Sequence, residues 1–116
     1  MTDCLAHYAA GTSPTADVER AAVTSVLNEL KRVAPGKSVE VRTPPYAAVQ
    51  VVEGVNHRRG TPSAVVELSA STLLRLAVGE VEWQSERASG RVSASGERSD
   101  LSHLFPLWPS RHSEPN

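Results

Sequence analysis

The sequence predicts one small domain of the α/β (α+β) class, with helices packed against a single sheet. Its 116 residues, 40% of them hydrophobic and 22% charged, suit one compact domain with one core. Segments with the period of a helix and segments with the alternation of a strand both occur along the chain. Aromatic residues make up only 4% and isoleucine is absent, so valine, leucine and alanine must fill the core.

The first half of the chain predicts a loose start followed by the longest helix. Residues 1–16 are expected to form a flexible N-terminal segment, since Gly11 to Pro14 interrupts the chain. Asp17 is expected to cap a helix from Val18 to Val33, which Pro35-Gly36 ends. Its apolar positions recur every three or four residues, at Val18, Ala22, Val26, Leu30 and Val33, and Val23 and Leu27 widen the apolar stripe.

Three strands are predicted next, and their succession favours an antiparallel meander. They cover Val39 to Arg42, Tyr46 to Glu53 and Ala64 to Leu68, separated by a Pro-Pro turn and a polar loop. In the second strand the odd positions are all apolar: Ala47, Val49 and Val51. One face of the sheet should therefore be drier than the other.

The second half returns to helices before a last strand. Ser69 or Ser71 is expected to cap a helix that ends at Gly79, followed by a short helix from Trp83 to Ser89 that Gly90 stops. Arg91 to Ser95 alternates as the final strand, and Ser99 or Asp100 can cap a helix from Leu101 to Phe105. The domain is thus predicted to span residues 17–108, with residues 109–116 as a flexible tail.

Charge and cysteine content exclude several classes of protein. A net charge of -1 and a pI near 6.4 do not suit a general nucleic-acid binder. The single cysteine, Cys4, excludes an internal disulfide and fits a reducing compartment, so we expect a cytoplasmic protein. No apolar run reaches the ~20 residues of a transmembrane helix, and the start lacks the features of a signal peptide.

The residues give little support for catalysis, and we expect no enzyme activity, cofactor or metal. Asp100, Ser102 and His103 lie close in sequence, but the chain has no Gly-x-Ser-x-Gly turn to present a nucleophile. The four histidines have no His-x-x-x-His spacing that would indicate a metal site.

The large apolar side chains of the second half have two interpretations. They can line a site for an apolar ligand, or they can simply fill the core, which is the commoner role in a small domain. Likewise, His57, Arg58 and Arg59 can hold an anionic head group, although a solvated loop is the commoner role for such a run.

The second half also resembles a known family. The run from Leu73 to Gly79, followed by Ala88 to Glu97, is similar to the C-terminal half of the sterol carrier protein two-like superfamily. The spacing of Gly79, Gly90 and Gly96 matches that pattern of helix, short helix, strand and closing helix. Short actinobacterial members also have a Thr-Pro-Pro-Tyr run and a His-Arg-Arg-Gly loop before this core. The chain departs from longer members in placing Trp83 where a proline is commoner.

The resemblance implies a mixed, largely antiparallel sheet of about five strands, with helices on one face around an apolar cavity. Members of the family bind sterols, fatty acids or acyl-CoA without catalysis. It thus implies a lipid-like ligand lined by Val49, Val51, Leu73, Leu76, Trp83, Leu101, Leu104, Phe105 and Trp108. Two alternatives stay open: a protein-interaction module with a closed cavity, and an accessory domain to a thiol-dependent isomerase. The sequence fixes neither the ligand, nor a protein partner, nor the oligomeric state.

Overall fold

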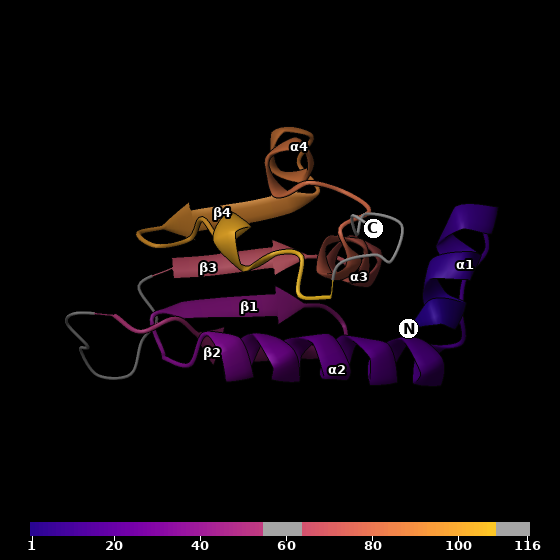
Figure 1. The fold of residues 1–116 in the computed structure, drawn as a ribbon, viewed down its shortest axis with the longest axis horizontal. Coiled ribbons are helices and arrows are strands. Elements are labelled where there is room, and N and C mark those ends of the chain that lie inside the picture. Colours follow the sequence, from indigo (N-terminus) through magenta and orange to yellow (C-terminus); the bar gives the residue numbers. More distant parts are fainter. Residues whose placement is uncertain (55–63, 109–116) are drawn as a thin grey trace, which may run out of the picture.

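A computed structural model describes residues 1–54 and 64–108 as one α/β domain. Figure 1 shows its elements in chain order. They are α1 (Thr2–Ala10), α2 (Ala16–Val33), β1 (Val39–Thr43), β2 (Ala47–Val51), β3 (Ala64–Leu68), α3 (Ala70–Val78), α4 (Trp83–Ala88), β4 (Val92–Gly96) and the 3-10 turn η1 (Ser102–Leu104). The predicted tail, residues 109–116, lies outside the described residues.

The sheet is mixed, with the strand order β2-β1-β3-β4. β1 pairs antiparallel with β2 and parallel with β3, and β3 pairs antiparallel with β4. The prediction of an antiparallel meander is therefore wrong, because β3 joins β1, with Val39 opposite Ala64, instead of extending from β2. Alternation along a strand indicates which face is buried and carries no information about its neighbour. Within the described ranges the sheet has four strands, against the five or so that the resemblance implies.

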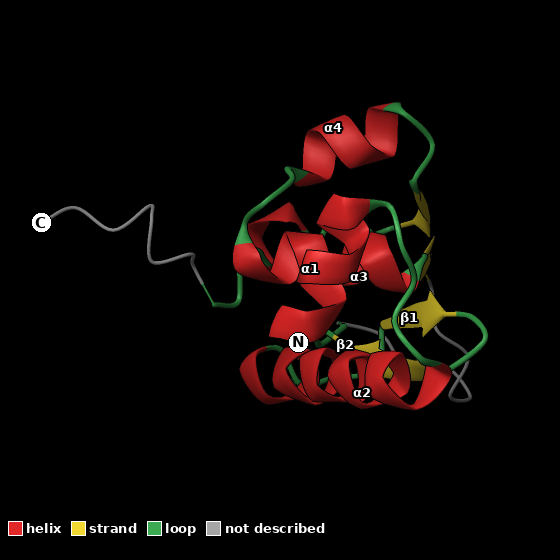
Figure 2. Ribbon diagram, turned by 90° about the vertical axis from the view of Figure 1, so that its right-hand side faces the viewer, coloured by secondary structure: helices red, strands yellow, loops and turns green. Residues whose placement is uncertain are grey.

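The helices α1, α2 and α3 lie on one side of the sheet, as Figure 2 shows, and α4 lies beyond the β4 edge. The inner face of the sheet is apolar, and its buried side chains are Val39, Val41, Val51, Ala64, Val66, Leu68 and Val92. The outer face carries Glu40, Arg42, Glu67 and Ser93. On β2 the drier face is confined to Val49 and Val51, since Ala47 is exposed at the edge of the sheet.

The longest helix, α2, begins two residues earlier than the sequence predicts. Thr15, not Asp17, is the N-cap, and its hydroxyl accepts a hydrogen bond from the amide of Val18. Asp17 lies within the first turn, where its charge favours the positive end of the helix dipole. The buried stripe is Ala22, Val23, Val26, Leu27 and Leu30, while the predicted end positions Val18 and Val33 are about two-fifths exposed.

The predicted flexible start contains a helix. α1 ends at Gly11, whose left-handed conformation (φ 75°) lets its amide and that of Thr12 close the last turn. Cys4 faces inward and is fully buried, and Leu5 and Tyr8 pack against the core. The sequence prediction missed α1 because tertiary contacts with α2 and α3 stabilise a helix that is short for one alone in water.

The second half follows the predicted order closely. Ser69 caps α3 through the amide of Thr72, and Gly79 ends the helix with φ 82°. Gly90, between the short helix and the strand, and Gly96, the last residue of β4, also have positive φ, at 86° and 94°. The closing helix is shorter than predicted: a single 3-10 turn, in which the amide of Phe105 donates to the carbonyl of Ser102. Pro106 has no amide to continue it.

None of the helices in residues 1–54 and 64–108 is long and apolar enough to cross a membrane.

Candidate functional site

The chain after β4 folds back onto α3 and forms an apolar covering segment, residues 101–108. In Figure 1 it passes in front of β4 and β3 on its way to α3. Leu101 is buried, and a side-chain oxygen of Asp100 accepts a 2.9 Å hydrogen bond from the amide of Ser102 at the start of η1. Four large apolar residues follow, each half-buried against the core: Leu104, Phe105, Leu107 and Trp108.

The covering segment is tied to the end of α3 through one backbone carbonyl. The amides of Leu107 and Trp108 donate to the carbonyl oxygen of Ala77, at 2.8 and 2.9 Å. The last carbonyls of a helix have no partner within the helix, so α3 offers an acceptor here. Pro106 also lies against Gly79, where a Cβ on the glycine would be 3.5 Å from the proline ring.

Trp83, the first residue of α4, is the aromatic neighbour of this segment. Its ring stacks on that of Phe105 with centroids 6.0 Å apart and an interplanar angle of 16°. Trp83 is buried, and its indole Nε1 has no hydrogen-bond partner within the described chain. The hydroxyl of Thr43 on β1 also has no partner, so two buried side-chain polar atoms of the described ranges are unsatisfied.

The predicted ligand-lining residues fall into two groups. One surrounds α3, α4 and the covering segment, and comprises the buried Leu73, Leu76, Trp83 and Leu101 with the half-buried Leu104, Phe105 and Trp108. The other, Val49 and Val51, lies on β2 at the opposite edge of the sheet from β4, where β2 contacts α2. His57, Arg58 and Arg59 lie outside the described residues.

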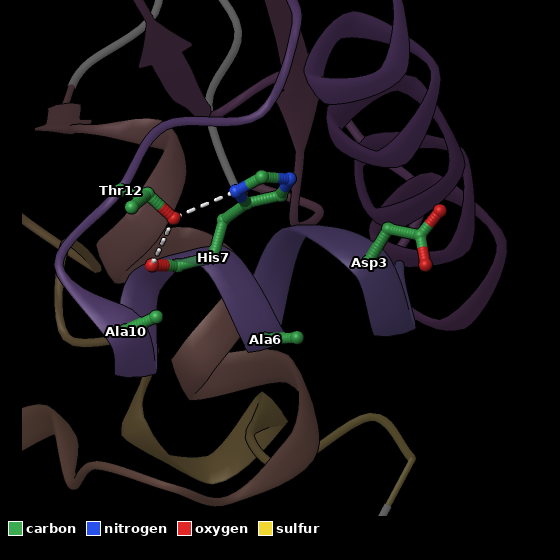
Figure 3. A pocket seen from close by; sticks show the side chains of 5 residues that line it. All are labelled: Asp3, Ala6, His7, Ala10 and Thr12. Carbon is green, nitrogen blue, oxygen red and sulfur yellow. Dashed lines mark hydrogen bonds between the residues drawn. The ribbon is translucent and has the colours of Figure 1, made fainter.

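Two surface hollows lie away from these residues. One follows α1 and is lined by Asp3, Ala6, His7, Ala10 and Thr12 (Figure 3). There His7 Nδ1 and Thr12 Oγ1 are 2.8 Å apart, and both side chains serve to close the end of α1. The other is lined by Pro44, Glu67, Leu68, Ser69, Gly90, Arg91 and Ser93.

A polar cluster joins α1, α2 and the turn between β1 and β2, and sequence reasoning missed it. Both tyrosines of the chain donate to the carboxylate of Glu19: Tyr8 to Oε2, and Tyr46 to Oε1 at 2.6 Å. Burial, followed by its hydrogen bond to Glu19, raises the pKa of Tyr8. For Tyr46, its own hydrogen bond to Glu19 is the larger cause and burial the smaller, and together they raise its pKa. The phenols therefore stay protonated and keep donating to Glu19, and the bond from Tyr8 holds α1 against α2. No local spacing could reveal it, because Tyr8 and Tyr46 lie 11 and 27 residues from Glu19.

The thiol of Cys4 lies next to this cluster, 3.9 Å from the carbonyl oxygen of Val18. Burial raises its pKa, which keeps the thiol protonated and unreactive at neutral pH. The cluster therefore has the character of a structural joint, with no activated nucleophile.

Asp100 lies just before η1, and Ser102 and His103 lie within it. The bond that Asp100 accepts from the amide of Ser102 lowers the pKa of that carboxyl, and His103 is exposed. Across residues 1–54 and 64–108, no three histidine, cysteine or acidic side chains are grouped to hold a metal ion.

The chain matches a known protein family. A family model described as bacterial SCP ortholog, where SCP denotes sterol carrier protein, matches residues 16–107. The match runs from the first residue of α2 to Leu107 in the covering segment and leaves α1 outside. No curated protein matches the chain.

Proposed function

The chain belongs to the bacterial family of sterol carrier protein orthologs, and from this membership we propose that it binds a lipid-like apolar molecule without catalysing a reaction. The family indicates a function of lipid-carrier type in general. The proposed site lies between α3, α4, the sheet and the covering segment. The tail of the ligand would lie against Leu73, Leu76, Leu104 and Phe105.

One observation supports this proposal most directly. Four large apolar side chains of residues 104–108 are only half-buried, and they sit on a segment joined to α3 through a single carbonyl. Moving this segment outward breaks few backbone bonds and opens the apolar core beneath it. A lipid tail entering there would gain ~0.8 kcal/mol for each methylene that it buries.

The same surface supports a second candidate, a protein-interaction module. Leu104, Phe105, Leu107 and Trp108 are neighbours in sequence and form an apolar rim, and such rims occur at protein interfaces. In this alternative the covering segment stays closed and its outer side contacts a partner protein. The two functions differ in whether stripped protein binds a free lipid.

The test is saturable binding of a fluorescent fatty acid to delipidated protein at ~100 μM, where a carrier worth about -5.5 kcal/mol registers. Leu104→Asp should weaken binding at least tenfold, because it places a carboxylate in the apolar site. Val33→Asp is the matched control, since Val33 is 42% exposed and is the last residue of α2, outside the covering segment. Native mass spectrometry of protein from its host should show a co-purifying lipid.

Absence of saturable binding of fatty acids, acyl-CoA and sterols by stripped wild-type protein would contradict the carrier function. The interaction module would then take its place. Equal loss of binding in Leu104→Asp and Val33→Asp would show that binding is not at the covering segment.

We also propose a cytoplasmic location. Cys4 is a buried free thiol in a chain with no second cysteine, which suits a reducing compartment.

A further inference from the structure

The buried indole N–H of Trp83 is a donor without an acceptor. Trp83 is 4% exposed, and its Nε1 has no partner among the residues that the structure describes. A buried donor left unpaired costs about 1–3 kcal/mol, and buried tryptophan usually finds an acceptor. A nearby acceptor is therefore expected when the protein is in its working state.

The need for an acceptor is stricter for Trp83 than for Thr43, whose hydroxyl is the other unsatisfied buried side-chain group of the described residues. A hydroxyl rotates and can either donate or accept, so it can adapt to its surroundings. The indole nitrogen can only donate, and stacking on Phe105 fixes the plane of its ring. The indole therefore needs an acceptor, whereas a hydroxyl does not.

The position of this donor suggests where the acceptor comes from. Phe105 covers one face of the Trp83 ring and belongs to the covering segment, whose backbone is anchored at the carbonyl of Ala77. That carbonyl already receives two N–H groups. A molecule that enters beneath the covering segment would reach the neighbourhood of Trp83 and could bring an oxygen to it.

We propose, resting on the proposed function, that Trp83 is the polar anchor of the ligand site and donates its indole N–H to one neutral oxygen within the ligand. The ligand class is then an apolar chain or ring system with a buried carbonyl or hydroxyl oxygen. A carboxylate is disfavoured at this point, because one neutral donor does not compensate the burial of a full charge. Trp83 thus determines specificity for an oxygenated lipid over a plain hydrocarbon.

The experiment compares two probes of matched length, a straight-chain methyl ketone and the corresponding alkane. Delipidated wild-type protein should bind the ketone about tenfold more tightly, as one net hydrogen bond implies. Trp83→Phe should discriminate between ketone and alkane less than about twofold, and this ratio is the readout because the smaller ring also changes the absolute affinity for both probes. Thr43→Val is the matched control, because it removes the other unsatisfied buried group and should keep the tenfold preference.

A second measurement uses wild-type protein alone, so the test does not depend on a variant that folds. The chain has two tryptophans, Trp83 and Trp108, whose indole N–H groups give two signals in a nitrogen-15 NMR spectrum. The ketone should move the Trp83 proton signal downfield, as expected for a new hydrogen bond, and the alkane should not.

The outcomes separate this inference from the proposed function. If both probes bind wild-type protein equally, or the ketone binds without a downfield shift at Trp83, then Trp83 does not donate to the ligand. The carrier function stands in either case. A preference that survives in Trp83→Phe also overturns the anchor. If neither probe nor any lipid binds, the carrier function fails and the anchor fails with it.

Discussion

The hydroxyl of Tyr46 donates a 2.6 Å hydrogen bond to Oε1 of Glu19, while Tyr8 occupies the other oxygen of the same carboxylate. Through these two bonds one glutamate of α2 joins the turn before β2 to the N-terminal helix. Arg20 lies over the Tyr46 ring at 5.5 Å and Arg75 over the Tyr8 ring at 5.8 Å, so each tyrosine also faces a cation. α1, which lies outside the region that matches the family, is thus fastened by polar contacts to residues inside that region.

Tyr8→Phe should loosen α1, and Cys4 can report it. Cys4 is fully buried and is the chain's single cysteine, so its rate of labelling by a thiol reagent in native buffer measures local opening. Losing a hydrogen bond to a carboxylate costs about 1.5 kcal/mol or more, which corresponds to labelling at least tenfold faster. Tyr46→Phe is the control: it removes a bond to the same Glu19 but none to α1, and should change the rate less. Equal rates in all three proteins would refute the role of Tyr8.

Alanine substitution should affect Gly36 and Gly90 very differently. Gly90 has φ 86° but open space around it, so Gly90→Ala should cost only the backbone strain of about 1 kcal/mol. A Cβ on Gly36 would lie 2.1 Å from the carbonyl carbon and oxygen of Val52, and that oxygen also accepts a hydrogen bond from Ser38. Gly36→Ala should therefore cost several kcal/mol or prevent folding. Urea denaturation of both variants measures the difference, and similar losses would contradict it.

Acid should weaken the joint between α4 and β4. Both carboxylate oxygens of Glu86, which is buried, accept bonds from the Arg91 guanidinium at 2.8 and 3.0 Å. These bonds lower the pKa of Glu86 in the folded state. The stabilisation is thus present above the unfolded pKa of about 4.3 and is lost as the pH falls through the lower folded value.

A pH series of urea denaturations tests this. Glu86→Gln should lower the free energy of unfolding at pH values above about 5 and flatten its fall in acid. Glu97→Gln, at an exposed turn position, should leave the acid dependence close to that of wild type. An unchanged acid dependence in Glu86→Gln would exclude this ion pair as its source.

Leu101, which precedes η1, and Leu104, its last residue, should differ in their contribution to stability. Leu101 is 1% exposed, so Leu101→Ala should cost about 2–4 kcal/mol in the free energy of unfolding. Leu104 is half-buried, and Leu104→Ala should cost about 1 kcal/mol while weakening lipid binding. Thermal unfolding monitored by circular dichroism measures both. Equal losses would mean that the covering segment packs more evenly than the structure describes.

Local features of the fold could be predicted from the sequence, and long-range ones could not. The run from Ala64 to Leu68 forms β3 as predicted, and Ser69 and Gly79 begin and end α3, because alternation, capping and left-handed glycine act over a few residues. The parallel pairing of β1 with β3 depends on which strand edges meet in three dimensions. α1 likewise depends on contacts with distant residues.

The candidate site shows the same division. Apolar spacing identifies Leu73, Leu76 and Leu101 as buried, but it cannot tell a core position from a ligand contact, since both require the same side chains. The missing acceptor of Trp83 Nε1 and the shared carboxylate of Glu19 become visible only in three dimensions.

The parallel ladder between β1 and β3 is also a boundary between two contiguous stretches of chain. Residues 1–54 contribute α1, α2, β1 and β2, and residues 64–108 contribute everything on the other side of that ladder. Because both stretches belong to one chain, each experiences a high effective concentration of the other, as in a covalently linked heterodimer. A cut in the link would turn this internal boundary into a subunit interface, and the cohesion of the domain would then depend on protein concentration.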